Sequence, residues 1–116
     1  MKNMLEFYTR LFVEIDISLE KLLQLIATYC NGTINMRTVE IEEFEMDIMK
    51  SEYALTYHDP NDFMSYKYNI EIVNIKEVLL SDYLKFVRKL MNNLYNHNAK
   101  VVASCDWEDD LPSLGV

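Results

Sequence analysis

The strongest constraint on the fold is a change of hydrophobic period near the N-terminus. Residues 7–17 alternate, with apolar side chains or threonine at odd positions and a mixed set at even positions, which predicts a strand with one buried face. Ser18 then stands as an N-cap ahead of apolar residues at helical spacing, and Asn31-Gly32 follows as a stop signal. These signals predict a strand followed directly by a helix over residues 19–30.

The rest of the chain repeats these two periods. The apolar residues of the next strand change parity at Glu42-Glu43, which indicates a β-bulge. The predicted elements are a strand over residues 34–50, a turn over residues 57–62, a strand over residues 63–75, a helix from Ser81 to near residues 96–98, and a strand over residues 99–105.

The resulting order is β-α-β-β-α-β within 116 residues, a length that suits one domain. Right-handed crossovers then favour an α+β fold, a two-layer ferredoxin-like sandwich with a four-stranded antiparallel sheet and two helices on one face. The other face, which carries Tyr8, Phe12, Lys67 and Val73, is open unless the tail or a second subunit covers it. We expect a single domain over residues 1–116, with residues 106–116 as an acidic C-terminal tail.

The formal charge of −8 is concentrated in two short segments. Five acids lie within residues 40–47 and four within residues 106–110, and neither segment contains a lysine or an arginine. Such surfaces repel nucleic acid and membrane headgroups and attract basic partners. The candidate partner-binding residues are these nine acids and the tryptophan among them: Glu40, Glu42, Glu43, Glu45, Asp47, Asp106, Trp107, Glu108, Asp109 and Asp110.

Each segment also has a purely structural interpretation. The expected fold places Glu40 to Asp47 on an edge strand, where charged side chains prevent sheet-to-sheet aggregation. This structural explanation and a binding role are equally favoured. Trp107 either anchors a partner, as aromatic residues do in interfaces, or packs under the last strand beside Leu111. For Trp107 the packed position is favoured, with the four acids of the tail outside.

No motif in the sequence indicates catalysis. His58 lies in a turn and His97 follows a helix, and neither has a serine or cysteine partner nearby in sequence. A carboxylate next to Cys105 makes that thiol a poorer nucleophile. Residues 106–110 lack the spaced ligands of an EF-hand loop. We therefore expect no enzyme, no catalytic residue, no metal and no cofactor.

The cysteines and the N-terminus bear on the compartment. Cys30 and Cys105 form no CxxC motif, and reduced thiols are favoured over one disulfide. Charged residues interrupt the apolar N-terminal segment, so it is not a signal peptide, and no stretch approaches the ~20 apolar residues of a membrane helix. The sequence predicts a soluble cytoplasmic protein.

Two segments resemble known proteins. The tail VVASCDWEDDLP, residues 101–112, resembles a C-terminal signature of small bacterial immunity proteins from polymorphic-toxin and contact-dependent growth inhibition loci. The segment FEMDIMKSEYALTYHDPNDFMSYKYNIEIV, residues 44–73, resembles their hairpin of an acidic strand, a turn and an aromatic-rich strand. The resemblance implies a cytosolic inhibitor that occludes a cognate toxin domain, with the tail motif as a structural landmark.

Two functional hypotheses follow. The leading one is an immunity protein whose acidic segments steer a basic toxin domain, for example a nuclease, into a complex that blocks it. The alternative is a small regulatory or assembly module that forms a homodimer through its sheet and binds a protein or a small ligand. Neither hypothesis involves nucleic acid or a membrane as the partner.

Overall fold

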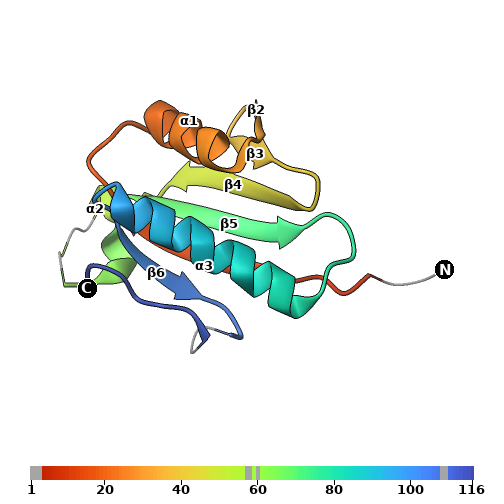
Figure 1. Cartoon of the computed structure of the whole chain (residues 1–116). Coiled ribbons are helices and arrows are strands. Elements are labelled where there is room, and N and C mark those ends of the chain that lie inside the picture. Colours follow the sequence, from red (N-terminus) through yellow and green to blue (C-terminus); the bar gives the residue numbers. More distant parts are fainter. Residues whose placement is uncertain (1–3, 57–58, 60, 108–109) are drawn as a thin grey trace.

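The computed structural model describes residues 4–56, 59, 61–107 and 110–116. Over these residues, six strands form one antiparallel sheet in the order β2-β3-β4-β5-β1-β6. The helices α1 and α3 lie on one face of this sheet (Figure 1). In chain order the elements are β1 (Tyr8–Glu14), α1 (Leu19–Cys30), β2 (Thr33–Asn35), β3 (Thr38–Glu40), β4 (Phe44–Lys50), α2 (Glu52–Thr56), the 3-10 helix η1 (Phe63–Ser65), β5 (Tyr68–Asn74), α3 (Leu80–Asn96) and β6 (Lys100–Ser104).

The expectation of a four-stranded ferredoxin-like sandwich with two helices is wrong, because the described residues form six strands and three α-helices. The difference arises in residues 34–50, which were expected as one strand but reverse direction twice. Met36, at a φ of 58°, lies in the turn between β2 and β3. A second turn at Glu42-Glu43 separates β3 from β4 and replaces the expected bulge. The third helix, α2, follows β4.

The two long helices begin and end close to their predicted positions. The helix over residues 19–30 is confirmed as α1, where Ser18 Oγ accepts the Lys21 N–H at 3.2 Å and Asn31 closes the helix in the left-handed conformation. The second helix, expected to open at Ser81, is α3. In the described part of the chain no helix is long and apolar enough to cross a membrane.

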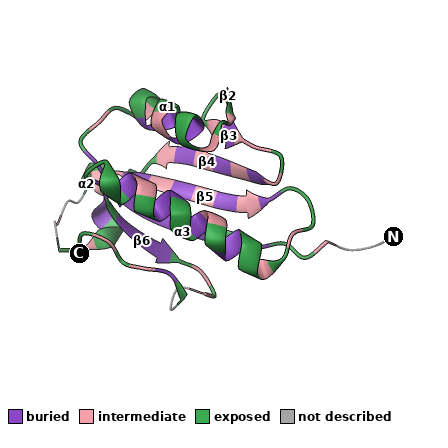
Figure 2. Ribbon diagram, viewed as in Figure 1, coloured by how far each residue is buried: buried purple, intermediate pink, exposed green. Residues whose placement is uncertain are grey.

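The core lies between the sheet and these two helices. Alternate residues of the central strands point toward the helices and are buried, whereas most residues between them are only partly covered (Figure 2). Burial of these apolar side chains is the main stabilising contribution. The largest fully buried side chains are Leu11, Leu22, Ile26, Met46, Ile48, Tyr68, Ile70, Ile72, Tyr83, Leu90, Met91 and Leu94.

A tyrosine hydroxyl inside this core ties α3 to the centre of the sheet. The Tyr83 hydroxyl lies 2.9 Å from Thr9 Oγ1 on β1 and donates to the Ile72 carbonyl on β5 at 2.7 Å. Tyr83 and Thr9 are both fully buried, so each satisfies a polar group that would otherwise lack a partner. The hydrogen bonds therefore fix how α3 sits over β1 and β5.

Between β4 and β5, the described residues 51–56, 59 and 61–67 include side chains that pack on the sheet face opposite the long helices, and we call these residues the flap. Its Phe63 ring lies edge-on to Phe12 at 5.2 Å, and Tyr66 is buried with Phe12 and Val102 in a small second core. The flap, and not the tail or a second subunit, therefore covers Phe12. On the same face Tyr8 is 44% exposed.

We expect Tyr83→Phe to lower the free energy of unfolding by about 1–2 kcal/mol, because the Thr9 hydroxyl loses its buried partner. Tyr95→Phe on the exposed side of α3 is the matched control and should change stability by less than about 0.5 kcal/mol. Urea unfolding measures both. Equal stability of the two variants would contradict the bonding role of the Tyr83 hydroxyl.

The same variant carries a pH signature. Burial raises the pKa of Tyr83 to about 12, from 10.0 for an exposed tyrosine. Between these pH values the unfolded chain releases this proton while the folded protein keeps it, so wild-type stability falls as the pH rises. Tyr83→Phe lacks this part of the fall, and urea unfolding at several pH values above 10 should show a shallower slope for the variant.

Candidate partner-binding surface

Three acids of residues 40–47 lie together on the sheet face that α1 and α3 leave uncovered. Glu40 on β3 pairs directly with Glu45 on β4, and Asp47 pairs directly with Glu71 on β5. All four are half-buried, and each alternates with a buried residue that points to the helices. The acidic sheet face is defined by these four carboxylates: Glu40, Glu45, Asp47 and Glu71.

Two of these carboxylates have partners on neighbouring strands. Thr38 Oγ1 donates to Asp47 Oδ1 at 2.6 Å, and Arg10 Nη2 donates to Glu71 Oε1 at 2.8 Å. The hydrogen bond with Glu71 raises the pKa of the Arg10 guanidinium, against the lowering effect of burial. For the opposed pair Glu40 and Glu45, the described residues provide no hydrogen-bond or ion-pair partner. Like charges directly opposite one another destabilise a sheet.

The position of β4 removes the structural explanation for these charges. The strand lies between β3 and β5, so the expectation that residues 40–47 form an edge strand is wrong. Protection of an edge from aggregation therefore does not account for Glu45 and Asp47. The edge on this side is β2, Thr33–Asn35, which carries no charged residue.

The other two acids of the run lie in the turn between β3 and β4. Lys76 Nζ donates to Glu42 Oε1 at 2.8 Å, and this hydrogen bond lowers the pKa of the Glu42 carboxyl and raises that of Lys76. Both side chains are exposed, so the pair contributes little to stability. Glu42 is thus already neutralised, and Glu43 borders the acidic sheet face without being part of it.

Tyr8 and Val73 are apolar neighbours at one side of this surface. Tyr8 pairs with Val73 across β1 and β5, and Val73 pairs with Glu45 across β5 and β4. An exposed aromatic residue with charged groups around it is a common anchor in protein interfaces. Sequence reasoning missed Glu71, although its place between two buried isoleucines indicated its face, because its position opposite Asp47 depends on strand register.

The tail folds back against the core. The Trp107 ring lies edge-on to Phe7 at 5.5 Å and to Tyr83 at 6.4 Å, and Leu111 is buried. Further on, Leu114 exchanges two 2.9 Å backbone hydrogen bonds with Val101 of β6. The packed position favoured for Trp107 is therefore confirmed, and this residue is not a free anchor.

The two described acids of the tail, Asp106 and Asp110, lie apart from the acidic sheet face. Asp106 and Asp110 are exposed, whereas Glu108 and Asp109 lie outside the described residues. The tail follows the end of β6, which is three strand spacings from β4, or about 14 Å. Asp106 and Asp110 therefore belong to a region of the fold separate from the acidic sheet face.

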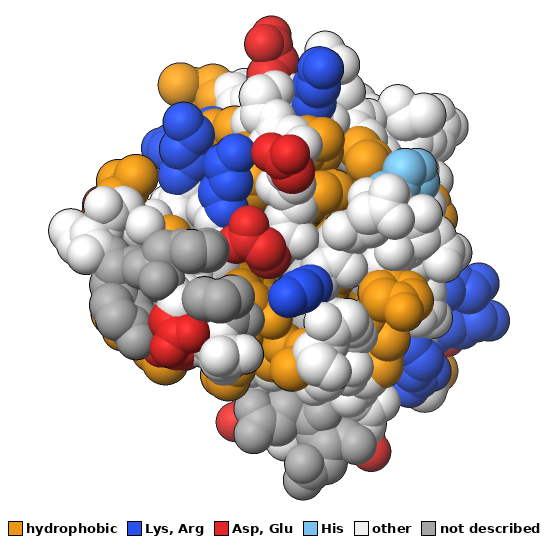
Figure 3. All heavy atoms as spheres, turned by 90° about the vertical axis from the view of Figure 1, so that its left-hand side faces the viewer, with side chains coloured by type: hydrophobic (Ala, Val, Ile, Leu, Met, Phe, Trp, Pro, Cys, Tyr) orange, Lys and Arg blue, Asp and Glu red, His pale blue; other side chains and the backbone are white. Residues whose placement is uncertain are grey.

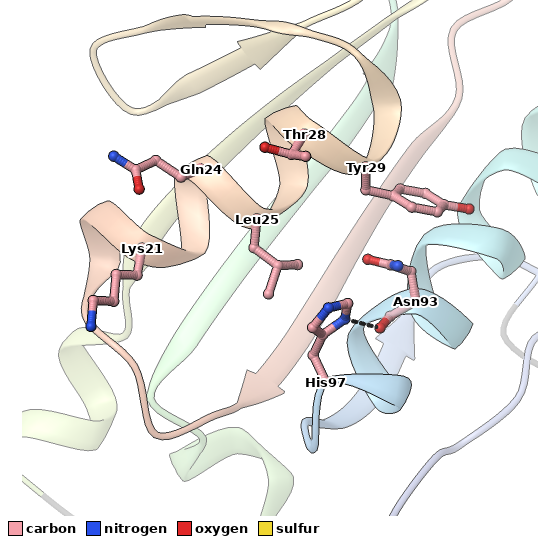
Figure 4. A pocket seen from close by; sticks show the side chains of 7 residues that line it. All are labelled: Lys21, Gln24, Leu25, Thr28, Tyr29, Asn93 and His97. Carbon is pink, nitrogen blue, oxygen red and sulfur yellow. Dashed lines mark hydrogen bonds between the residues drawn. The ribbon is translucent and has the colours of Figure 1, made fainter.

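A groove of about 520 Å³ lies between α1 and α3 (Figure 4). His97 Nδ1 donates to the Asn93 carbonyl at 2.9 Å, which holds the ring at the helix end. No carboxylate stands among the described lining residues, so the groove offers this histidine no acid–base partner. The other histidine, His58, lies outside the described residues. The groove is lined by Lys21, Gln24, Leu25, Thr28, Tyr29, Asn93 and His97.

The cysteines add no reactive site. Cys30 and Cys105 are free thiols, and Cys30 Sγ donates to the Ile26 carbonyl at 3.0 Å. Burial raises the pKa of the Cys30 thiol, which keeps it protonated and weakly nucleophilic. Over the ranges that the structure describes, no three His, Cys, Asp or Glu side chains are grouped to hold a metal ion.

Comparison of the chain with known proteins finds no match. The chain matches no protein-family model, no curated protein and no solved structure.

We expect Trp107→Ala to lower the free energy of unfolding by about 2 kcal/mol, because a half-buried aromatic contact with Phe7 and Tyr83 is lost. Asp106→Ala, at an exposed neighbouring position, is the control and should stay within about 0.5 kcal/mol of wild type. Urea unfolding followed by circular dichroism measures both. A wild-type stability for Trp107→Ala would show that the tail does not pack as described.

Proposed function

We propose that the chain is an immunity protein, which binds a cognate bacterial toxin domain through the acidic sheet face and occludes it. The observation that supports this most directly is a pair of like charges on two interior strands: Glu40 on β3 lies opposite Glu45 on β4, and neither has an ion-pair partner among the described residues. Such a pair destabilises the free protein, and edge protection does not account for it. A cationic partner surface would relieve this repulsion. The free energy that the repulsion costs the free protein would then favour the complex.

The chemistry of the surface defines the partner. Carboxylates attract a domain with clustered lysine and arginine side chains, such as the phosphate-binding surface of a nuclease, and increase its association rate. Tyr8 and Val73 then supply apolar contact beside the carboxylates. The resemblance of residues 101–112 to immunity proteins supports the same class, and we place the action in the cytoplasm of the producing cell.

The negative charge of this face also argues against the alternative hypothesis, a module that forms a homodimer through its sheet. Two copies that meet through this face would bring Glu40, Glu45 and Asp47 of one chain toward the same residues of the other. Repulsion between the two sets opposes that homodimer at neutral pH. The same carboxylates favour a basic partner of different sequence.

The test uses the C-terminal domain of a large secreted protein encoded next to this chain, produced as the candidate toxin. Co-expression of the chain should restore growth of cells that make this domain. With purified proteins, Glu40→Gln with Glu45→Gln should slow association by about tenfold at low salt and flatten its salt dependence, because steering charge is lost. Stopped-flow or biolayer interferometry measures the rate.

The matched control is Asp16→Asn with Glu20→Gln. It also removes two negative charges, but from exposed positions just before and within the first turn of α1. Its association rate should stay within about twofold of wild type. Two results would overturn the proposal. One is the absence of both protection and binding with the neighbouring domain. The other is an association rate that responds equally to the two double variants.

A further inference from the structure

The uncovered sheet face has a second feature, a hollow of about 520 Å³ between the sheet and the flap. This volume lies in the range of pockets that hold small organic groups. Figure 3 views the end of the molecule at which α2 lies and shows lysine and arginine side chains gathered toward its upper left (Figure 3). The side chains that matter most in the lining of the hollow are Arg10, Phe12, Arg37, Met49, Lys50 and Asn69.

The charge of this lining is opposite to that of the acidic sheet face. Arg10 is paired with Glu71, but Arg37 and Lys50 are exposed and have no ion-pair partner among the described residues. Glu52 is the one carboxylate of the described lining. The hollow therefore favours an anionic group, and a guanidinium beside an ammonium suits a carboxylate.

Two buried polar atoms in the lining lack hydrogen-bond partners within the described structure. They are Arg10 Nε, which is a donor, and Asn69 Oδ1, which is an acceptor. Nearly all buried polar atoms in folded proteins are satisfied, so a donor and an acceptor left together call for a ligand that carries one of each. Asn69 pairs with Phe12 and stands diagonally from Arg10, so the two side chains are neighbours on the same sheet face.

The apolar part of the hollow favours a ligand that also carries an apolar group. Phe12 and Met49 form part of the wall, and Met64 of the flap stands beside them with 51% of its surface exposed. A thioether side chain in such a position adapts its shape to an aliphatic or aromatic group. Its exposure leaves it free to move aside when a group enters.

We propose that this hollow binds an N-acyl amino acid with an apolar side chain, either free or as the C-terminal residue of a polypeptide. The carboxylate meets Arg37 and Lys50, the acyl carbonyl accepts from Arg10 Nε, and the amide N–H donates to Asn69 Oδ1. The apolar side chain packs on Met49 and Met64. The residues differ from the acidic sheet face and the test needs no toxin, so this proposal and the proposed function can fail separately.

The experiment is a titration of the ¹⁵N-labelled chain with N-acetyl-L-leucine, followed by backbone amide shifts in NMR spectra. Shifts should concentrate at Arg10, Arg37, Lys50 and Asn69. N-acetyl-L-leucinamide, which lacks the carboxylate, should bind about tenfold more weakly or not at all. The N-acetylated tripeptide Ala-Ala-Leu distinguishes the sources. A clearly tighter complex assigns the site to a polypeptide C-terminus, and equal affinity assigns it to a free acyl amino acid.

Variants provide the control. Arg37→Gln with Lys50→Gln changes exposed side chains and should weaken N-acetyl-L-leucine binding by about tenfold or more. Lys85→Gln with Lys89→Gln, also exposed but on α3, should leave the affinity within about twofold. The proposal is overturned if no shifts appear in the hollow. It is also overturned if the leucinamide binds equally well, or if the two double variants behave alike.

Discussion

The pairing register of β4 with β3 and β5 is the constraint on which both faces of the sheet depend. On one face the register buries Met46 opposite Ile72, and on the other it sets Glu45 opposite Glu40. A slip by one residue would exchange the faces, placing carboxylates in the core and Met46 in water. Burial of one such side chain contributes about 1.5–3 kcal/mol, whereas one opposed like-charge pair costs about 0.2–1 kcal/mol. The burial energy is therefore larger than the repulsion, and the register that buries Met46 also keeps the carboxylates opposite one another.

Local signals in the sequence predicted the elements whose boundaries depend on local chemistry. The alternation of residues 7–17 and the capped helical pattern of residues 19–30 predicted β1 and α1 well, because a strand period and a serine cap act over a few residues. The prediction failed in residues 34–50. The turn at Met36 lacks glycine and proline, and a change of parity at Glu42-Glu43 arises equally from a bulge or a tight turn. The missed turns account for the two additional strands.

The candidate site was predictable in part for the same reason. The acidic run over residues 40–47 is visible in the sequence, but Glu71 and Lys76 meet it through pairings of distant segments. The hollow beside the flap was not predictable, since Arg10, Arg37 and Asn69 come from separate parts of the chain. The fold thus divides one sheet face into an acidic half and a cationic hollow, although the sequence suggested only acidic segments.

The central claim is that Glu40 and Glu45 repel one another in the free protein, so that a cationic partner gains from meeting them. A double-mutant cycle by urea unfolding at low salt tests it most directly. Glu40→Gln and Glu45→Gln should each raise the free energy of unfolding by about 0.2–1 kcal/mol, and the double variant should gain clearly less than their sum. Additive effects, or a loss of stability in either single variant, would contradict the repulsion on which the proposed binding surface depends.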